Sequence, residues 1–274
     1  CDRLATICRD IKPVGPDGKP YGVDDLEEGR ALLARILSGR GHAVEPLADG
    51  KDALARLERG PVDLVVSDIR MAEVVCAAIR QKPVAHLIYI SSDAVYKDSP
   101  DPLTEASCAE PGALHGVMHL AREVAFRQEY AGPLAIVRPT LVYGFDDPHN
   151  GYGPNRFRRL AAAGKDIVLF GEGEERRDHV DVDDVAELVR LIVTRRSVGI
   201  ANAVSGEVAS FRELAEFVVS AFSPAVQIIS SPRIGPMPHG GYRPFDNSSV
   251  IKAFPGFRFK GWREGLAAIH ARQL

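Results

Sequence analysis

The stretch PVDLVVSDIRMAEVVCAAIRQKPVAHLIYISS, residues 61–92, decides the fold of this chain. It holds two compact apolar runs, separated by a segment whose apolar residues recur at helical spacing. Such runs are typical of strands that are buried on both faces of a parallel sheet. The order strand, helix, strand therefore predicts a doubly wound α/β fold with a parallel sheet.

The same alternation continues on both sides of this stretch. Upstream, helical spacing begins at residue 29 and is followed by a short strand, and a second short helix is predicted over residues 51–59. Downstream, further helices are predicted over residues 111–130, 155–164, 182–196, 210–222 and 261–273, with strands over 133–144 and 165–174.

Two local signals and a division into domains complete the prediction. Ser210 with Glu213 three residues later forms a capping-box pattern at a helix start, and the Gly- and Pro-rich residues 231–244 predict a loop. We expect a Rossmann-like domain over residues 1–145. Residues 146–274 should add a small α/β substrate-binding lobe and the last sheet elements.

The composition sets limits on partners and location. The chain has 274 residues, 45% hydrophobic and 26% charged, with a net charge of −3, which gives no general attraction to nucleic acid or to an anionic membrane. No apolar run approaches the ~20 residues needed to cross a bilayer, and no signal peptide is visible. The four cysteines form no CxxC pair, which favours reduced thiols and a cytoplasmic location. Because the chain begins with Cys, we expect that an N-terminal piece is missing.

Two histidines stand four residues apart in PGALHGVMHLARE, residues 111–123. On a helix, His115 and His119 share one face. Histidine titrates near ~6.5 and can be a general base at neutral pH. Two histidines at this spacing can also bind one metal ion, but a site needs further ligands, and Gly116 stands where zinc helices carry Glu. A third interpretation is a pair of surface histidines. Acid/base chemistry and the surface pair stay about level, and no metal site is expected.

From about residue 87 onward, the chain resembles the extended short-chain dehydrogenases, the NAD-dependent epimerase/dehydratase family. LIYISSDAVY is similar to that family's strand ending in a catalytic Ser or Thr, and residues 111–123 occupy the place of its Tyr-x-x-x-Lys helix. LAIVRPTLVYG resembles the strand whose end closes over the nicotinamide. LFGEGEERRDHVDVDDVAEL resembles its Arg-Asp segment, and YRPFDNSSVIKAF with GWREGL resembles the C-terminal part of its dTDP-sugar reductases.

The resemblance implies epimerisation, reduction or dehydration of a nucleotide sugar through NAD or NADP. Ser92 would donate a hydrogen bond to the reacting oxygen, His115 would replace the Tyr as acid/base, and His119 would replace the Lys in orienting the ribose. Cofactor-binding roles fall on Gly29, Ser91, His119, Pro139, Thr140 and Leu141. Substrate-binding roles fall on Asp93, Asn155, Arg177 and Arg243. A homodimer is a further expected partner.

Three of the substrate assignments have structural alternatives. Asp93 can be a turn or cap carboxylate, which is the favoured interpretation, and Asn155 can cap the helix that it opens. Arg177 corresponds to an Arg that grips the substrate diphosphate, a role that suits the bidentate guanidinium fork. Its alternative is a surface salt bridge to Asp178 or Asp181.

Residues 19–71 depart from the family. Its three glycine positions correspond to Val23, Leu26 and Gly29, and the four nearby carboxylates should repel a dinucleotide. The same segment resembles the first half of a response-regulator receiver domain. This resemblance implies that Asp24 and Asp25 bind magnesium and that Asp68 accepts phosphate. The receiver's Lys is absent, because only Arg138-Pro139 appears at its place.

The two resemblances agree on a doubly wound sheet but differ in strand order, 3-2-1 for the dehydrogenases and 2-1-3 for a receiver. They also leave two functions open. The alternative to the enzyme is a non-catalytic binding or regulatory protein on the same scaffold.

Overall fold

The computed structural model describes residues 4–7, 44–47, 55, 59, 64–67, 72–82, 84–146, 150–222 and 225–272. The chain forms two compact units, each built from separate segments. Unit 1 comprises Cys1–Val95, Ala109–Arg138 and Ala186–Ala201. Unit 2 comprises Tyr96–Cys108, Pro139–Val185 and Asn202–Leu274.

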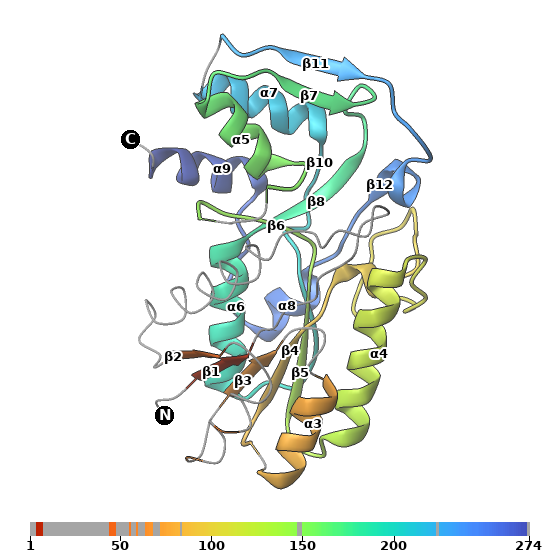
Figure 1. Ribbon diagram of the computed structural model, residues 1–274, viewed down its shortest axis with the longest axis vertical. Coiled ribbons are helices and arrows are strands. Elements are labelled where there is room, and N and C mark those ends of the chain that lie inside the picture. Colours follow the sequence, from red (N-terminus) through yellow and green to blue (C-terminus); the bar gives the residue numbers. More distant parts are fainter. Residues whose placement is uncertain are drawn as a thin grey trace. The chain divides into compact units, whose positions relative to one another are not determined.

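Unit 1 is built around parallel strands, as the alternation of strand and helix predicts (Figure 1). Its first three strands pair in the order β2-β1-β3, and β3 lies beside β4, which pairs with β5 and then β9. The order 2-1-3 is thus the one found among the described strands. The strands are β1 (Leu4–Ile7), β2 (Val44–Leu47), β3 (Leu64–Ser67), β4 (Leu87–Ile90), β5 (Leu134–Pro139) and β9 (Gly199–Ala203), of which β9 continues into unit 2.

Two helices of unit 1, α3 (Ala72–Gln81) and α4 (Leu114–Glu129), pack against each other (Figure 1). Helix α4 begins at Leu114, later than predicted, because residues 111–113 include Pro and Gly and Ala113 is extended without a side-chain cap. The apolar sides of α3, α4, β4 and β5 form one buried core. Its members are Val75, Cys76, Ala78, Ile79, Val84, Leu87, Tyr89, Phe126, Tyr130 and Ile136.

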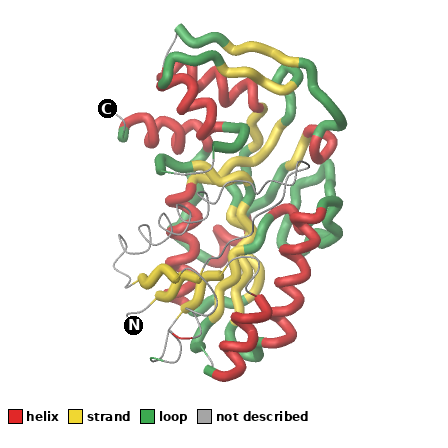
Figure 2. The backbone as a smooth tube through the Cα atoms, viewed as in Figure 1, coloured by secondary structure: helices red, strands yellow, loops and turns green. Residues whose placement is uncertain are grey.

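Unit 2 holds a mixed sheet and a two-stranded sheet. Strand β8 (Arg176–Asp181) pairs in parallel with β6 (Leu141–Tyr143) and β12 (Tyr242–Arg243), and antiparallel with β10 (Val208–Ser210). Figure 2 shows the second sheet as two strands running side by side. These are β7 (Ile167–Phe170) and β11 (Ile228–Ser231).

Helices cover the core of unit 2, which contains several aromatic rings. Helix α7 starts with the predicted capping box: the Glu213 carboxylate accepts the Ser210 N–H at 2.8 Å, and the Ser210 hydroxyl accepts the Glu213 N–H at 3.1 Å. The helices of unit 2 are α5 (Pro154–Ala162), α7 (Phe211–Phe222), α8 (Ser248–Ala253) and α9 (Trp262–Ala271). Helix α6 (Val182–Arg195) begins in unit 2, and most of its residues belong to unit 1.

The prediction of a loop over residues 231–244 is wrong for its last residues, Tyr242 and Arg243. Tyr242 and Arg243 form β12, because their backbone pairs in register with Arg176 and Arg177 of β8. This pairing joins segments far apart in the sequence, and nothing in the local Gly- and Pro-rich pattern indicates it. Within the described residues, no helix is both long enough and apolar enough to cross a membrane.

Candidate functional site

Helix α4 places both histidines on one side, as their spacing predicts. The ring centroids of His115 and His119 lie 4.6 Å apart in an edge-to-face arrangement. His115 is exposed, whereas His119 is buried. The hydroxyl of Tyr89, on β4, lies 2.9 Å from Nδ1 of His119. The histidine pair therefore has an outer member open to solvent and an inner member held by the sheet.

Burial lowers the pKa of His119 to about 4, and the nearby His115 and Arg122 contribute to this shift. His119 is therefore neutral at pH 7 and cannot supply the permanent positive charge of a Lys. When the Tyr89 hydroxyl donates to Nδ1, the ring proton of the neutral imidazole resides on Nε2. His119 can then donate one hydrogen bond.

The residues after β4 make a tight turn. The Ser92 hydroxyl accepts the backbone N–H of Ala94 at 3.1 Å and lies 3.4 Å from the Asp93 carboxylate. Asp93 is buried and opens the 3₁₀ turn η2 (Asp93–Val95), the kind of position that its structural alternative predicts. Ser92 is half-buried. Its catalytic role remains a prediction.

Gly116 allows α4 to approach this turn closely. A Cβ on Gly116 would lie 2.0 Å from the carbonyl oxygen of Ala94, so any side chain there would force the two backbones apart. In the sequence, Gly116 is notable only as a departure from the zinc-helix pattern. In the structure it brings the helix that carries His115 against the turn that follows Ser92.

Ser91 belongs to a buried ionic network. Its hydroxyl donates to Glu123 of α4 at 2.6 Å, and Arg138 of β5 donates to the two carboxylate oxygens of Glu123 at 2.8 and 2.5 Å. Glu123 and Arg138 are both fully buried, so each depends on the other for charge compensation. Arg138 thus holds α4 onto the sheet.

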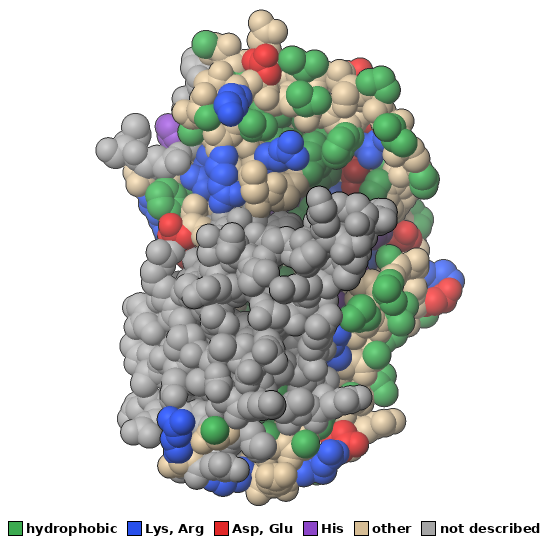
Figure 3. Space-filling model, in the orientation of Figure 1, with side chains coloured by type: hydrophobic (Ala, Val, Ile, Leu, Met, Phe, Trp, Pro, Cys, Tyr) green, Lys and Arg blue, Asp and Glu red, His purple; other side chains and the backbone are tan. Residues whose placement is uncertain are grey.

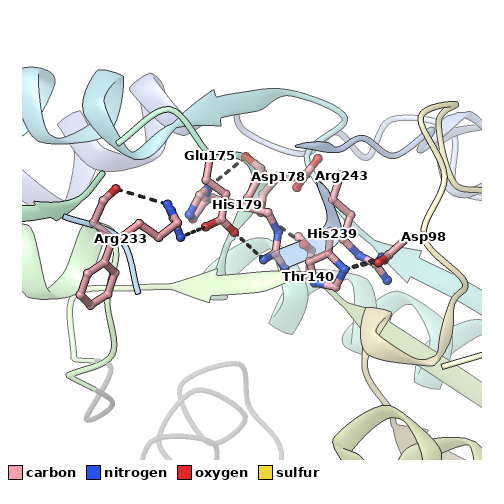
Figure 4. A network of polar contacts seen from close by, with 10 residues as sticks. Asp98, Thr140, Glu175, Asp178, His179, Arg233, His239 and Arg243 are labelled. Atoms are coloured by element: carbon pink, nitrogen blue, oxygen red, sulfur yellow. Dashed lines mark hydrogen bonds and ion pairs between the residues drawn. The ribbon is translucent and has the colours of Figure 1, made fainter. Parts of the chain in front are cut away.

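A second group of polar side chains lies in unit 2 (Figure 4). Arg177 of β8 is buried and pairs with Glu175 at 3.2 Å rather than with Asp178 or Asp181. Arg233 reaches the other oxygen of Glu175 at 3.5 Å. Within the described residues, Nε of Arg177 and Nε2 of the buried His179 have no hydrogen-bond partner.

Arg243 of β12 forms the other end of this network, with 1% of its side chain exposed. It donates to the Asp98 carboxylate at 2.5 Å, and His239 Nδ1 lies 2.5 Å from the same oxygen (Figure 4). The sequence gives no signal for Asp98, Glu175, Arg233 or His239. Asp98 is 145 residues from Arg243, so only tertiary folding brings the two together.

Asn155 and Thr140 stabilise loops in unit 2. The side-chain oxygen of Asn155 accepts the N–H of Gly144 at 3.2 Å, whereas Gly153 occupies the N-cap position of α5. Thr140 is buried, and its hydroxyl donates to the carbonyl of Asp178 at 3.2 Å. Asn155 therefore positions the turn after β6 instead of capping its helix, and its substrate role remains a prediction.

The predicted cofactor residues fit NAD(P) only in part. The hydroxyls of Ser91 and Thr140 serve internal hydrogen bonds, while Pro139 ends β5 and Leu141 begins β6. When the Tyr89 hydroxyl donates to Nδ1 of His119, the Nε2 of His119 can donate toward a ribose oxygen. Outside the described residues lie Val23, Leu26 and Gly29, and with them Asp24, Asp25 and Asp68.

A metal ion bound by His115 and His119 would need a third ligand. Among the described residues, no group of three or more His, Cys, Asp or Glu side chains is placed to hold a metal ion.

The fold and these two groups of residues define a class of protein. It is a Rossmann-like α/β protein with buried arginine–carboxylate pairs in unit 2. A solved structure of MoeE5 in complex with UDP-glucose and NAD superposes with a TM-score of 0.76 at 17% identity, covering 100% of this chain and 98% of that chain. The model of the NAD dependent epimerase/dehydratase family matches residues 25–204. This chain belongs to that family.

Sequence relatives give a finer comparison. Putative GDP-L-fucose synthase 2 of Oryza sativa subsp. japonica is 30% identical over 178 residues, which are 58% of this chain and 51% of the relative. Transcriptional regulatory protein TcrA of Mycobacterium tuberculosis is 39% identical over 66 residues, 23% of this chain and 26% of that protein. The chain spans about half the length of the rice relative that it matches.

Proposed function

We propose that this protein binds a nucleotide sugar and carries out epimerase-, reductase- or dehydratase-type chemistry on it with NAD or NADP. The observation that carries the proposal is the arginine network of unit 2 in a chain of this family. Arg177 and Arg243 are buried guanidinium groups, each held by one carboxylate. Permanently charged, planar donors of this kind suit the oxygens of a diphosphate.

Unit 1 would supply the proton-transfer groups. His115 is exposed and could take a proton from a sugar hydroxyl, while Ser92 would donate a hydrogen bond to the reacting oxygen. His119, neutral and oriented by Tyr89, would donate from Nε2 to a ribose oxygen. NAD(P), when bound, supplies the hydride acceptor or donor. That MoeE5 was solved with UDP-glucose and NAD supports this choice of ligands.

The second candidate is a non-catalytic binding or regulatory protein. It is favoured by His119, whose pKa of about 4 leaves it neutral at the position where the family resemblance implies a Lys. It is also favoured by the hydroxyls of Ser91 and Thr140, which donate to Glu123 and to the carbonyl of Asp178 within the protein. The short match to a transcriptional regulatory protein points the same way. This candidate predicts binding of a nucleotide sugar without turnover.

Turnover assays on purified protein separate the two candidates. UDP-, GDP- and dTDP-sugars are incubated with NAD⁺, NADH or NADPH, and products are followed by absorbance at the reduced nicotinamide band and by NMR of the sugar. The enzyme proposal expects turnover that His115→Ala lowers by ~10²–10⁴-fold, the usual contribution of a positioned acid/base. His119→Ala should instead mainly raise the KM for the cofactor.

The Arg177→Lys variant keeps the charge but loses the bidentate fork, and it should mainly raise the KM for the sugar nucleotide. Binding without any turnover across the panel would favour the non-catalytic candidate. Full activity of His115→Ala on a substrate that the wild type converts would show that the histidine pair is structural.

A further inference from the structure

We propose that His239 is a ligand for the substrate diphosphate and takes up a proton when the diphosphate binds to unit 2. The inference rests on the proposed function and extends it with a residue that neither the sequence pattern nor the family resemblance indicates. His239 lies in the 3₁₀ turn η3 (Pro238–Gly241), next to the buried Arg243 (Figure 4). Its side chain is 25% exposed, so a ligand can reach it.

The contacts of His239 fix which ring nitrogen faces outward. Nδ1 lies 2.5 Å from the Asp98 carboxylate, a distance that requires a proton between them. Nδ1 therefore donates to Asp98, although Nη1 of Arg243 lies 3.1 Å away. Nε2 makes no hydrogen bond within the described part of the chain. In the neutral ring, Nε2 is an acceptor that repels phosphate oxygen; in the protonated ring it is a charged donor.

The charges of the network explain why a proton is needed. Three arginines of the network (Figure 4), Arg177, Arg233 and Arg243, stand against four carboxylates, which gives a formal net charge of −1 before any ligand binds. Glu174, Glu175 and Asp98 pair with the arginines, and the buried carboxylate of Asp178 accepts the backbone N–H groups of Ser205 and Gly206. A nucleotide-sugar diphosphate carries about two negative charges, and uncompensated charge in a partly buried site is unfavourable. Protonation of His239 supplies one positive charge.

The protonation state before binding follows from its neighbours. Burial lowers the pKa of His239, and the charges of Arg177 and Arg243 lower it further, whereas Asp98 raises it. The imidazole is therefore neutral at pH 7 in the free protein. An anion beside Nε2 favours the charged form and raises the pKa, so binding and protonation are coupled.

The backbone of His239 has a φ of 53°, which places a residue other than glycine in the left-handed region. Asparagine is more readily accepted in this region, which supplies a well-matched variant.

Calorimetry measures the proton uptake directly. UDP-glucose, GDP-fucose and dTDP-glucose are screened, because the diphosphate diester of a nucleotide sugar does not titrate near neutral pH. The tightest binder is then titrated at pH 7 in PIPES, HEPES and Tris, whose ionisation enthalpies differ. For the wild type we expect uptake of a substantial fraction of one proton. Affinity should fall as pH rises from 6 to 8.

His239→Asn keeps an N–H donor toward Asp98 but cannot be protonated at the position of Nε2. We expect it to lose the proton uptake and the pH dependence, and to weaken binding about tenfold at pH 6. His270→Gln, which removes a histidine in the last turn of α9, should behave as the wild type.

The outcomes distinguish this inference from the proposed function. Tight binding with equal proton uptake in the wild type and in His239→Asn would overturn the role of His239 and leave the proposed function standing. Failure of all three nucleotide sugars to bind the wild type would overturn both.

Discussion

At the scale of the residue, neighbouring side chains set the chemistry of His119, Arg177 and Arg243. His119 is made neutral by burial and oriented by Tyr89, while Arg177 and Arg243 are held by Glu175 and Asp98. His119 of α4 is thus an uncharged group at neutral pH. In unit 2, the positive charges of Arg177, Arg233 and Arg243 are offset by the carboxylates of the same network.

Burial of a neutral His119 links stability to pH. The pKa is about 4 in the folded protein and ~6.5 for a histidine in an unfolded chain, so the unfolded state binds more protons between these values. The free energy of unfolding should therefore fall as pH drops from about 6.5 to 4. The contribution of His119 is of order 1–3 kcal/mol.

Urea titrations at several pH values check this expectation. His119→Gln should be less sensitive to acid than the wild type over this range. His179, whose pKa burial lowers to about 3, remains in both proteins and contributes equally to both curves. Identical pH dependence of the wild type and His119→Gln would contradict a buried neutral His119.

At the scale of the element, α4 connects the candidate catalytic residues to the sheet. Its inner side is fixed by the Glu123–Arg138 pair and by Tyr89, and its first turn contacts η2 through Gly116. Its outer side carries an exposed apolar stripe. Leu114, Val117 and Val124 are 73%, 47% and 46% exposed, and hydrophobic side chains gather over this helix in Figure 3.

Gly116→Ala tests the contact of α4 with η2. A methyl group 2.0 Å from the Ala94 carbonyl oxygen must move the helix, so we expect a loss of about 1–3 kcal/mol in the free energy of unfolding. Turnover should fall as well, because His115 is the preceding residue. Gly112→Ala is the matched control, since no described atom lies within 4 Å of a Cβ there. Equal stability of the two variants would refute the close approach.

The apolar stripe of α4 predicts a homodimer through this helix. Exposed apolar patches are enriched at protein–protein interfaces. Multi-angle light scattering should give the mass of a dimer for the wild type and of a monomer for Val117→Asp combined with Val124→Asp. Val168→Asp changes an equally exposed valine on β7 and should remain dimeric. A monomeric wild type at high concentration would exclude this interface.

At the scale of the whole molecule, the chain combines a family fold with an unusual first segment. The family match begins at residue 25. In the alignment predicted from the sequence, the three glycine positions of the family correspond to Val23, Leu26 and Gly29, among four carboxylates. Backbone approach to a pyrophosphate requires glycine, and negative charge opposes it. NAD(P) binding in the proposed reaction should therefore be weaker than in a family member that carries all three glycines.

Calorimetric titration with NADH and NADPH decides this point. The combined replacement of Asp24, Asp25, Glu27 and Glu28 by the corresponding amides should strengthen binding if the carboxylates are responsible. Micromolar binding of either cofactor to the unaltered chain would show that the cofactor loop lies elsewhere.

The sequence by itself determined the architecture and the family. The alternation of apolar runs and helical spacing predicts the doubly wound sheet, the four-residue spacing puts both histidines on one side of α4, and the Ser210–Glu213 pattern predicts a capping box that forms. These features depend on residues close together in the chain. Backbone geometry alone converts their spacing into a shared face or a local hydrogen bond.

Only the tertiary structure decided how the side chains of the two groups are paired. Tyr89 is 30 residues from His119, and Asp98 is 145 residues from Arg243. The structural use of Gly116 and the strand at Tyr242–Arg243 likewise depend on segments that meet only on folding. The periodicity of apolar residues predicts which face of a helix or strand is buried. It does not predict which distant side chain pairs with a buried charged group. That choice is made by packing, since a buried ion or donor must find its partner wherever the fold brings one within reach.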